Sequence, residues 1–593
     1  MKSRHAVMVL IVLFGIMSAG SWQRWANPII DGGREMNTPL RLLQGEQIYS
    51  EVYYLYGPVA PFFNALLYKL FGVHLGTLYA AGLAGGLFLV LLIFYLGRRF
   101  MSVFEAMLAA VAVLLLCVLK LRGNMIFPYS YAALYGTILG TLALTAQLAH
   151  IRSNRLRSLF VAGALSGLTL CCKLEFGFAA IASLVALVTS SPRRERLRNA
   201  GVALLAALIF PLLIYGFLFA RIPAGPLFKD TFLLPGHIPA ELVYFNKMKL
   251  GLDDPGRTLR ELISAVALLT GAAGIFSLAG LRMAGESVLS APRAQEARRL
   301  WWITGISGGF ILLHILLYGV HWDLNPFRAL PILFLGMIYY YFTEQGGSEK
   351  DEPPLRALLL ISVYSLAVLA RVFVRVPAGG SYGSGLLPVP LLLFFYIAKS
   401  DLPIAKLPPA AAQFRRRFVL VGFSIALAAV MGVLVYRQIE NDYVPLRTTR
   451  GELWFPAGHI SAMNQALDFI ARNTSPAEYL LMLPEGSSLN FLANRPVPVR
   501  YEIATPGFVR SDEERIMIHQ IQEKKVRYIF LFNRPTSEFG PKIFGQDYCH
   551  ILMKWINSNF ELAAVFGEHV TTDMQIGDSQ FFIKCYRKKD SGQ

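Results

Sequence analysis

Charge is scarce in this chain of 593 residues, because Asp, Glu, Lys and Arg make up only 16% while hydrophobic residues make up 55%. The mean hydropathy of +0.48 excludes a soluble globular protein, and the long apolar runs are too numerous for one buried core. The net charge is +18, but Lys and Arg fall in short clusters between apolar runs, as in membrane loops. We therefore predict an integral membrane protein that does not bind nucleic acid.

Cysteine is also rare, with five residues in the chain. None has CxxC spacing or a neighbouring His cluster, so there is no zinc-site pattern. Cys549 and Cys585 lie in the C-terminal polar region and would pair only in an oxidising compartment, which the sequence leaves undecided. That region also lacks a Gly-rich nucleotide fingerprint, which argues against a nucleotide-sugar site there.

Apolar runs of about twenty residues, the length that crosses a bilayer as a helix, predict about thirteen spans. Basic clusters at 98–99, 152–157, 193–198, 293–299 and 415–417 share one side with the N-terminal Lys2 and Arg4, and the positive-inside rule assigns that side to the cytoplasm. An odd number of spans then places the C-terminus outside. The predicted spans are residues 6–24, 77–97, 102–120, 130–149, 158–172, 175–191, 199–219, 261–281, 301–319, 327–343, 355–373, 383–398 and 418–436.

The expected fold class is an α-helical polytopic membrane protein with a C-terminal extracytoplasmic α/β domain. Residues 1–440 form the transmembrane domain, and its first outer loop, 25–76, holds apolar stretches at 39–44 and 60–71 that predict interfacial helices. Residues 441–593 carry amphipathic patterns near 458–472 and 545–560, with β-like runs at 479–483, 526–532, 562–566 and 581–586. These patterns predict a soluble α/β domain in the periplasm or outside the cell, attached to the cytoplasmic (inner) membrane.

The first outer loop concentrates carboxylates, guanidinium groups and phenols between two membrane-length apolar runs, where free charge is costly. Asp31, Arg34, Glu35, Glu51 and Tyr56 all fall within it. A carboxylate at the membrane surface, such as that of Asp31, can take a proton from an acceptor hydroxyl or hold a metal ion. The alternative is a helix N-cap, and the two roles are compatible.

These residues carry a family resemblance. The Asp after the first membrane helix, Arg-Glu at 34–35, Gly45, Tyr49, Glu51 and the Tyr56-Gly-Pro58 turn together resemble polytopic glycosyltransferases of the GT-C class. More narrowly, they are similar to bacterial relatives of dolichyl-phosphate-mannose protein mannosyltransferases and of lipid A aminoarabinose transferases. The resemblance implies that Asp31 is the catalytic carboxylate, with Glu35 or Glu51 in support.

The second outer loop lacks the acidic motif that many GT-C enzymes carry there; Asn124 and Tyr129 are its nearest polar groups. The sequence therefore identifies no cofactor with certainty. A divalent metal is possible, but no second acidic motif indicates one. Lys173 interrupts an apolar pair of spans, either as an ion pair with Glu175 or as an anion ligand. In the class, a Lys at this point is thought to contact the lipid phosphate of the donor.

Other outer segments offer further candidate ligands. Arg34, Arg221, Lys229 and Arg375 are candidates for the donor phosphate, although basic residues of such loops equally contact anionic lipid headgroups. Candidates for contact with the sugar or the acceptor are Tyr56, Tyr129, His321 and Tyr382.

The predicted function is transfer of a sugar from a polyprenyl-phosphate donor to an acceptor at the outer face of the cytoplasmic membrane, with inversion and with Asp31 as the base. A lipid-linked donor is expected because nucleotide sugars are not supplied on that face. The partners are this donor, membrane lipid and an acceptor that the sequence does not identify, whether protein, lipid or glycan. The alternative is a lipid or solute transporter or flippase, which we rank second because the polar residues gather at one membrane face and not at the midplane.

Overall fold

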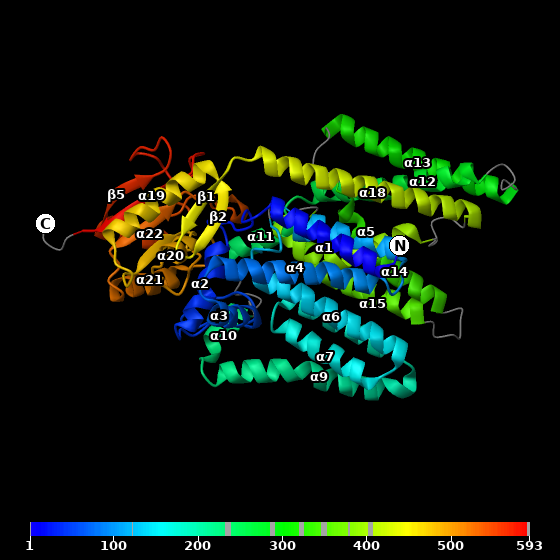
Figure 1. The fold of residues 1–593 in the computed structure, drawn as a ribbon, viewed down its shortest axis with the longest axis horizontal. Helices are drawn as coiled ribbons and strands as arrows, with labels where there is room; N and C mark the ends of the chain where they lie inside the picture. Colours follow the sequence, from blue (N-terminus) through cyan, green and yellow to red (C-terminus); the bar gives the residue numbers. More distant parts are fainter. Residues whose placement is uncertain are drawn as a thin grey trace.

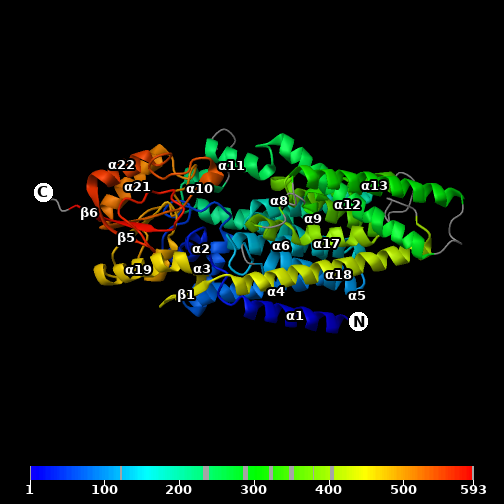
Figure 2. The same cartoon turned by 90° about the horizontal axis from the view of Figure 1, so that it is seen from above.

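The computed structural model describes residues 2–120, 123–231, 239–284, 291–318, 325–345, 353–377, 380–400 and 407–589. The chain forms a long bundle of helices with a mixed α/β region at one end, and the N-terminus lies toward the opposite end of the bundle (Figure 1). The view from above in Figure 2 gives the same division, with α18 running along the bundle toward the strands.

Every predicted span overlaps a helix. Seven helices of the described residues are long and apolar enough to cross a membrane, or up to eight if the pair α16–α17, bent by 67°, counts as one. The number of crossings and their orientation stay predictions. The bundle helices are α1 (Ser3–Gly20), α4 (Leu75–Gly97), α5 (Val103–Val113) with the π-helix Leu114–Val118, α6 (Tyr131–Ser153), α7 (Leu156–Leu170), α8 (Leu174–Thr189), α9 (Arg193–Phe219), α12 (Pro255–Met283), α13 (Ala291–Tyr318), α14 (Leu330–Gln345), α15 (Pro353–Val368), α16 (Gly380–Leu386), α17 (Pro388–Lys399) and α18 (Pro409–Glu440).

Small residues allow neighbouring bundle helices to approach closely. At Gly167 of α7 a Cβ atom would lie 2.0 Å from the carbonyl oxygen of Ala207 in α9, so only glycine fits there. Such contacts are typical of helices packed in lipid, where dispersion contacts and not the hydrophobic effect hold helices together. The outer face of α9 exposes large apolar side chains such as Leu205 and Leu212, as a lipid-facing helix should.

The first outer loop folds into two short helices, α2 (Gly32–Leu43) and α3 (Val59–Phe71). The prediction for 60–71 matches α3, but α2 begins at Gly32 and not near Pro39, so the charged segment itself is helical. Most of α2 is buried, because its start packs against the C-terminal region: a Cβ atom at Gly33 would lie 2.3 Å from the backbone nitrogen of Ser488. The helix α2 is therefore a buried layer between bundle and C-terminal region, whereas α3 keeps an exposed apolar face with Leu70 and Phe71.

The C-terminal region is a mixed α/β structure in which β3 runs parallel to β4 and the other pairs are antiparallel, in the strand order β3-β4-β6-β5. An antiparallel hairpin of β1 (Tyr443–Thr448) and β2 (Gly451–Pro456) leads into it. Cys549 and Cys585 are buried and free. The elements are α19 (Ala457–Asn473), β3 (Leu480–Leu483), α20 (Ser488–Ala493), α21 (Ser511–Glu523), β4 (Tyr528–Phe532), α22 (His550–Asn559), β5 (Phe560–Phe566) and β6 (Ile583–Lys588).

Four short elements complete the surroundings of the site. The helices α10 (Ala224–Thr231) and α11 (Ala240–Leu250) follow α9, and α11 contacts the C-terminal region, since a Cβ atom at Gly507 would lie 2.8 Å from Leu242. Two 3₁₀ turns, Ala370–Val372 and Ser537–Phe539, also contact α11.

Candidate functional site

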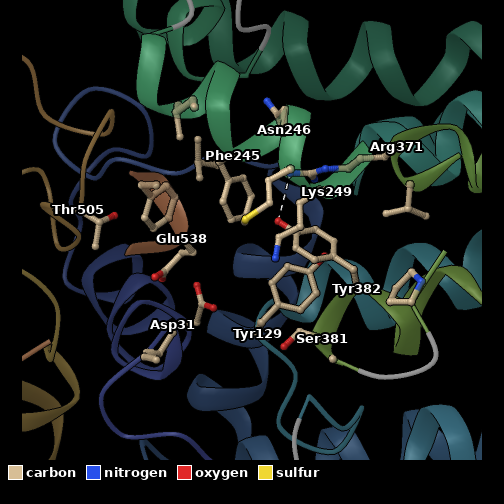
Figure 3. Close-up of a pocket in the computed structure, with 18 of the residues that line it drawn as sticks. Asp31, Tyr129, Phe245, Asn246, Lys249, Arg371, Ser381, Tyr382, Thr505 and Glu538 are labelled. Atoms are coloured by element: carbon tan, nitrogen blue, oxygen red, sulfur yellow. Dashed lines mark hydrogen bonds between the residues drawn. The ribbon is translucent and has the colours of Figure 1, made fainter. Parts of the chain in front are cut away.

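A cavity of about 1140 Å³ lies where the bundle, the first outer loop, α11 and the C-terminal region meet. In Figure 3, Asp31 and Glu538 lie on one side of this cavity and Arg371 on the other, with Tyr129 and Tyr382 between them. The charged and phenolic residues of its lining are Asp31, Arg34, Tyr56, Tyr129, Glu175, Lys249, Arg328, Arg371, Arg375, Tyr382, Glu485, Arg534 and Glu538.

Asp31 occupies the N-cap position of α2, but its side chain accepts no capping hydrogen bond from the helix. Its Oδ1 instead lies 3.1 Å from Nη2 of Arg34, and the side chain keeps 29% of its surface exposed. The Asp31 backbone has φ 61° and ψ −31°, an uncommon conformation for a residue other than glycine. The carboxylate therefore lines the cavity and does not cap the helix.

The electrostatic surroundings of Asp31 come from several elements. Burial raises the pKa of the Asp31 carboxyl, against the opposing fields of Arg34, Arg534 and Lys173. Glu485 follows β3, and burial raises its pKa to about 7, with Arg534 acting in the opposite direction and Asp31 adding to the rise. Two carboxyl groups with raised pKa values therefore share one end of the cavity, the kind of environment in which acid–base groups are found.

Glu35 faces away from the cavity. Its side chain is 3% exposed, and Nε of Arg34 lies 3.2 Å from its Oε1. The backbone N–H of Tyr131 donates to Oε2 over 2.8 Å. These bonds tie α2 to the start of α6, so Glu35 supports Arg34, which also donates to the carbonyl oxygen of Tyr129 over 2.8 Å.

Lys173 does not line the cavity itself, but it contacts two tyrosines that do, Tyr56 and Tyr129. Its Nζ donates to the Tyr129 hydroxyl over 2.8 Å and lies 3.9 Å from the centre of the Tyr56 ring. Within the described part of the chain, no carboxylate lies at ion-pair distance from Lys173. Glu175 pairs instead with Arg371, whose Nη1 is 2.7 Å from Oε1 of Glu175. Lys173 and Glu175 therefore form no direct ion pair, although their charges still interact.

Further cations gather on the side of the cavity that the bundle and α11 form together, called the bundle side below. Nη2 of Arg371 donates to the Tyr382 hydroxyl over 3.1 Å, and Nζ of Lys249 lies 4.9 Å from the centre of the Phe245 ring. Arg375 lines the cavity as well, with Nη1 2.9 Å from Oδ1 of Asp253. Cations and aromatic faces side by side suit a phosphate joined to a sugar.

Four predicted residues lie elsewhere or outside the described side chains. Glu51 is exposed and accepts from the backbone N–H of Gln47 over 2.6 Å in its own turn, so we assign it no role in the site. Arg221 is exposed after α9, with its guanidinium 4.3 Å from the Phe217 ring centre, and does not line the cavity. Lys229 belongs to α10, but its side chain, like the whole of His321, lies outside the described residues.

The sequence interpretation missed the residues that the C-terminal region supplies. Glu485, Arg534 and Glu538 line the cavity, and Arg534 pairs with both glutamates, at 3.1 Å and 2.5 Å. A signal was present, because Glu485 and Arg534 each follow closely after a buried strand, where polar side chains of neighbouring parallel strands meet. Among the described residues, no three His, Cys, Asp or Glu side chains gather as a metal-binding group.

Comparison with known proteins agrees with this architecture. A family model described as dolichyl-phosphate-mannose-protein mannosyltransferase matches residues 56–217. No curated protein matches the chain significantly.

Two solved structures are similar to this chain over most of its length. The structure of ArnT from Cupriavidus metallidurans bound to undecaprenyl phosphate has a TM-score of 0.51 at 11% identity, covering 98% of this chain and 97% of that chain. The archaeal oligosaccharyltransferase AglB from Archaeoglobus fulgidus, in complex with an inhibitory peptide and a dolichol-phosphate, has a TM-score of 0.48 at 12% identity. There the match covers 96% of this chain and 75% of that chain.

At such low identity the likeness to ArnT establishes a shared fold. Together with the family model it confirms the resemblance to GT-C enzymes and indicates a membrane glycosyltransferase, not the transporter considered as the alternative.

Proposed function

We propose that this protein transfers a sugar from a polyprenyl-phosphate donor to an acceptor at the outer face of the cytoplasmic membrane, with Asp31 as the base. The observation that carries the proposal is the uncapped carboxylate of Asp31, directed into a cavity whose bundle side holds Lys249, Arg371 and Arg375. The same cavity thus offers a proton acceptor and several ligands for an anion, as transfer of a sugar from a phosphate leaving group requires.

The donor phosphate would lie on the bundle side of the cavity. The Lys173 ammonium forms no direct ion pair in the described structure and is held by the phenols of Tyr56 and Tyr129, which line the cavity. A phosphate that approaches these phenols neutralises the charge of Lys173, with Arg371 and Arg375 as further ligands. ArnT, which shares this fold, has undecaprenyl phosphate bound in its solved structure and supports this assignment.

The sugar would lie between that phosphate and Asp31, against the rings of Tyr129 and Tyr382. These rings are 5.3 Å apart and offer apolar faces to a pyranose or furanose ring together with hydroxyl groups for hydrogen bonds.

The reaction follows as a single displacement. Asp31 accepts the proton of the acceptor nucleophile, the nucleophile forms a bond to the anomeric carbon, and the bond from that carbon to the phosphate oxygen breaks. The polyprenyl phosphate leaves with the electron pair of that bond, and the cations of the bundle side stabilise its charge. Attack from the face opposite the leaving group inverts the anomeric configuration. Arg34 orients the carboxylate of Asp31 from its position one helical turn further on.

Native mass spectrometry and turnover together test the proposal. The protein in lipid nanodiscs is titrated with undecaprenyl phosphate and then incubated with a panel of synthetic polyprenyl-phosphate sugars. We expect bound undecaprenyl phosphate, and release of free polyprenyl phosphate from at least one sugar donor in a membrane extract that supplies acceptor. Release that is equally fast with the Asp31→Asn variant, or no binding of undecaprenyl phosphate, would contradict the proposal.

A further inference from the structure

Glu485 makes the direct link between the C-terminal region and Asp31. The residue is 5% exposed, and its Oε1 accepts a hydrogen bond of 2.7 Å from the backbone N–H of Asp31. Its Oε2 accepts from Nε of Arg534 over 3.1 Å. Residues separated by 454 positions in the sequence therefore meet at the wall of the cavity.

The backbone that Glu485 holds is under strain. Asp31 combines φ 61° with ψ −31°, and such a conformation at a residue with a side chain is strained and persists only where the surroundings impose it. Glu485 holds the N–H of this residue, and Arg34 holds its carboxylate. The next turn of α2 is seated on the same part of the C-terminal region, because Gly33 leaves no room for a Cβ atom beside Ser487 and Ser488.

We propose that Glu485 is a positioning residue through which the C-terminal region holds Asp31 in its reactive geometry, so that the site is complete only when this region is docked on α2. The inference rests on the proposed function of Asp31 and extends it, since none of the comparisons assigns a role to the C-terminal region.

The chemistry of the contact fits positioning better than substrate binding. Both oxygens of Glu485 are occupied, one by Asp31 and one by Arg534. Arg534 is itself held by Glu538 at 2.5 Å, which fixes the whole group. The hydrogen bond from the Asp31 N–H to Glu485 is short, at 2.7 Å, so the contact is well suited to hold a strained backbone.

Variants at Glu485 distinguish the effect of losing this hydrogen bond from the effect of destabilising the fold. Glu485→Ala removes the acceptor, and Glu485→Gln keeps an oxygen for the Asp31 N–H. Glu502→Ala is a matched control, because Glu502 is a second buried glutamate of the C-terminal region that pairs across the same interface, with Nη1 of Arg41 at 3.2 Å, without touching Asp31.

We expect Glu485→Ala to lower the turnover of polyprenyl-phosphate sugar by about 10–100-fold, the cost of a misplaced catalytic group, with little change in KM for the donor. Glu485→Gln should restore most of the turnover, and Glu502→Ala should change thermal stability more than turnover. Equal turnover of the Glu485→Ala and Glu502→Ala variants would overturn the proposal, as would a Gln variant as impaired as the Ala variant.

A second readout does not require a known substrate. Carbodiimide labelling followed by peptide mass spectrometry measures the reactivity of the Asp31 carboxyl in the intact protein. Loss of the hydrogen bond should release the strained turn and increase labelling of Asp31 in Glu485→Ala, but not in Glu502→Ala. If no tested donor turns over, the proposed function fails while this labelling still decides the role of Glu485; unchanged labelling would overturn it.

Discussion

The Lys173 ammonium is held by the hydroxyl of Tyr129, 2.8 Å away, and by the face of the Tyr56 ring, 3.9 Å away. Lys173 itself is 1% exposed. Burying an ammonium group costs several kcal/mol unless it is compensated, and two phenols supply only part of that compensation. The fields of Glu175 and Asp31 supply a further part without a direct ion pair, and an anion that enters the cavity beside these phenols would complete it.

Replacement of Lys173 should weaken binding of a lipid phosphate. We expect Lys173→Ala to raise the Kd for undecaprenyl phosphate by about tenfold or more, since one charge-assisted contact contributes on the order of 1.4 kcal/mol or more. Titration in nanodiscs by native mass spectrometry measures this. Lys69→Ala, which removes an exposed cation of α3, is the control for general attraction to the membrane; an unchanged Kd for Lys173→Ala would return Lys173 to a structural role.

Replacement of Asp31 should separate chemistry from binding. Asp31→Asn keeps the size of the side chain and an oxygen for Arg34, so the variant should fold and bind undecaprenyl phosphate as before. Loss of the base should lower turnover by about 10²–10⁴-fold. The measurement is release of free polyprenyl phosphate under single-turnover conditions, and an active Asn variant would show that another group accepts the proton.

Local sequence patterns predicted the helices well because the bilayer imposes its own requirement on each span, namely a long apolar run with its hydrogen bonds internal. The same reasoning located the charged turn that contains Asp31. It could not predict that Glu485 would hold Asp31, since nothing local links positions so far apart. It also overrated Glu51, because a carboxylate in a polar loop can equally well turn outward to its own backbone, as Glu51 does toward Gln47.

A second buried carboxylate should affect stability alone. Glu105, at the start of α5, is 2% exposed on its side chain and pairs with Arg416 at 2.5 Å and Lys399 at 3.1 Å. Glu105→Gln leaves these cations without their counter-charge, and we expect a loss of about 2 kcal/mol, less than a fully buried pair would cost because Arg416 is half exposed.

The measurement is the melting temperature in detergent, with binding of undecaprenyl phosphate as the functional readout. Ser102→Ala, which removes only the N-cap of α5, should cost less, about 1 kcal/mol. A Glu105→Gln variant that melts like the wild type would show that the cluster is not stabilising, and one that loses lipid binding would show that it communicates with the cavity.

The neighbouring carboxyl groups of Asp31 and Glu485 should make both stability and activity depend on pH near neutrality. Burial raises the pKa of Glu485 to about 7 from an ordinary value of 4.5. Between these values the folded protein keeps a proton that the unfolded chain releases, so this group stabilises the fold fully at low pH and loses its contribution as the pH rises through about 7.

Activity should increase as the pH rises, in contrast to stability. Asp31 must be ionised to accept a proton, and its pKa is also raised by burial. The groups that face it are Arg34, Arg534 and Lys173, which favour ionisation, and Glu485, whose own pKa is raised by the Asp31 charge. Turnover should therefore rise with pH on the acid side, and Glu485→Gln should shift the profile near pH 7, where the wild type loses the Glu485 proton beside the ionised Asp31. Turnover of a polyprenyl-phosphate sugar from pH 4 to 9 in both proteins measures the shift; coincident profiles would mean that the two carboxyls do not interact.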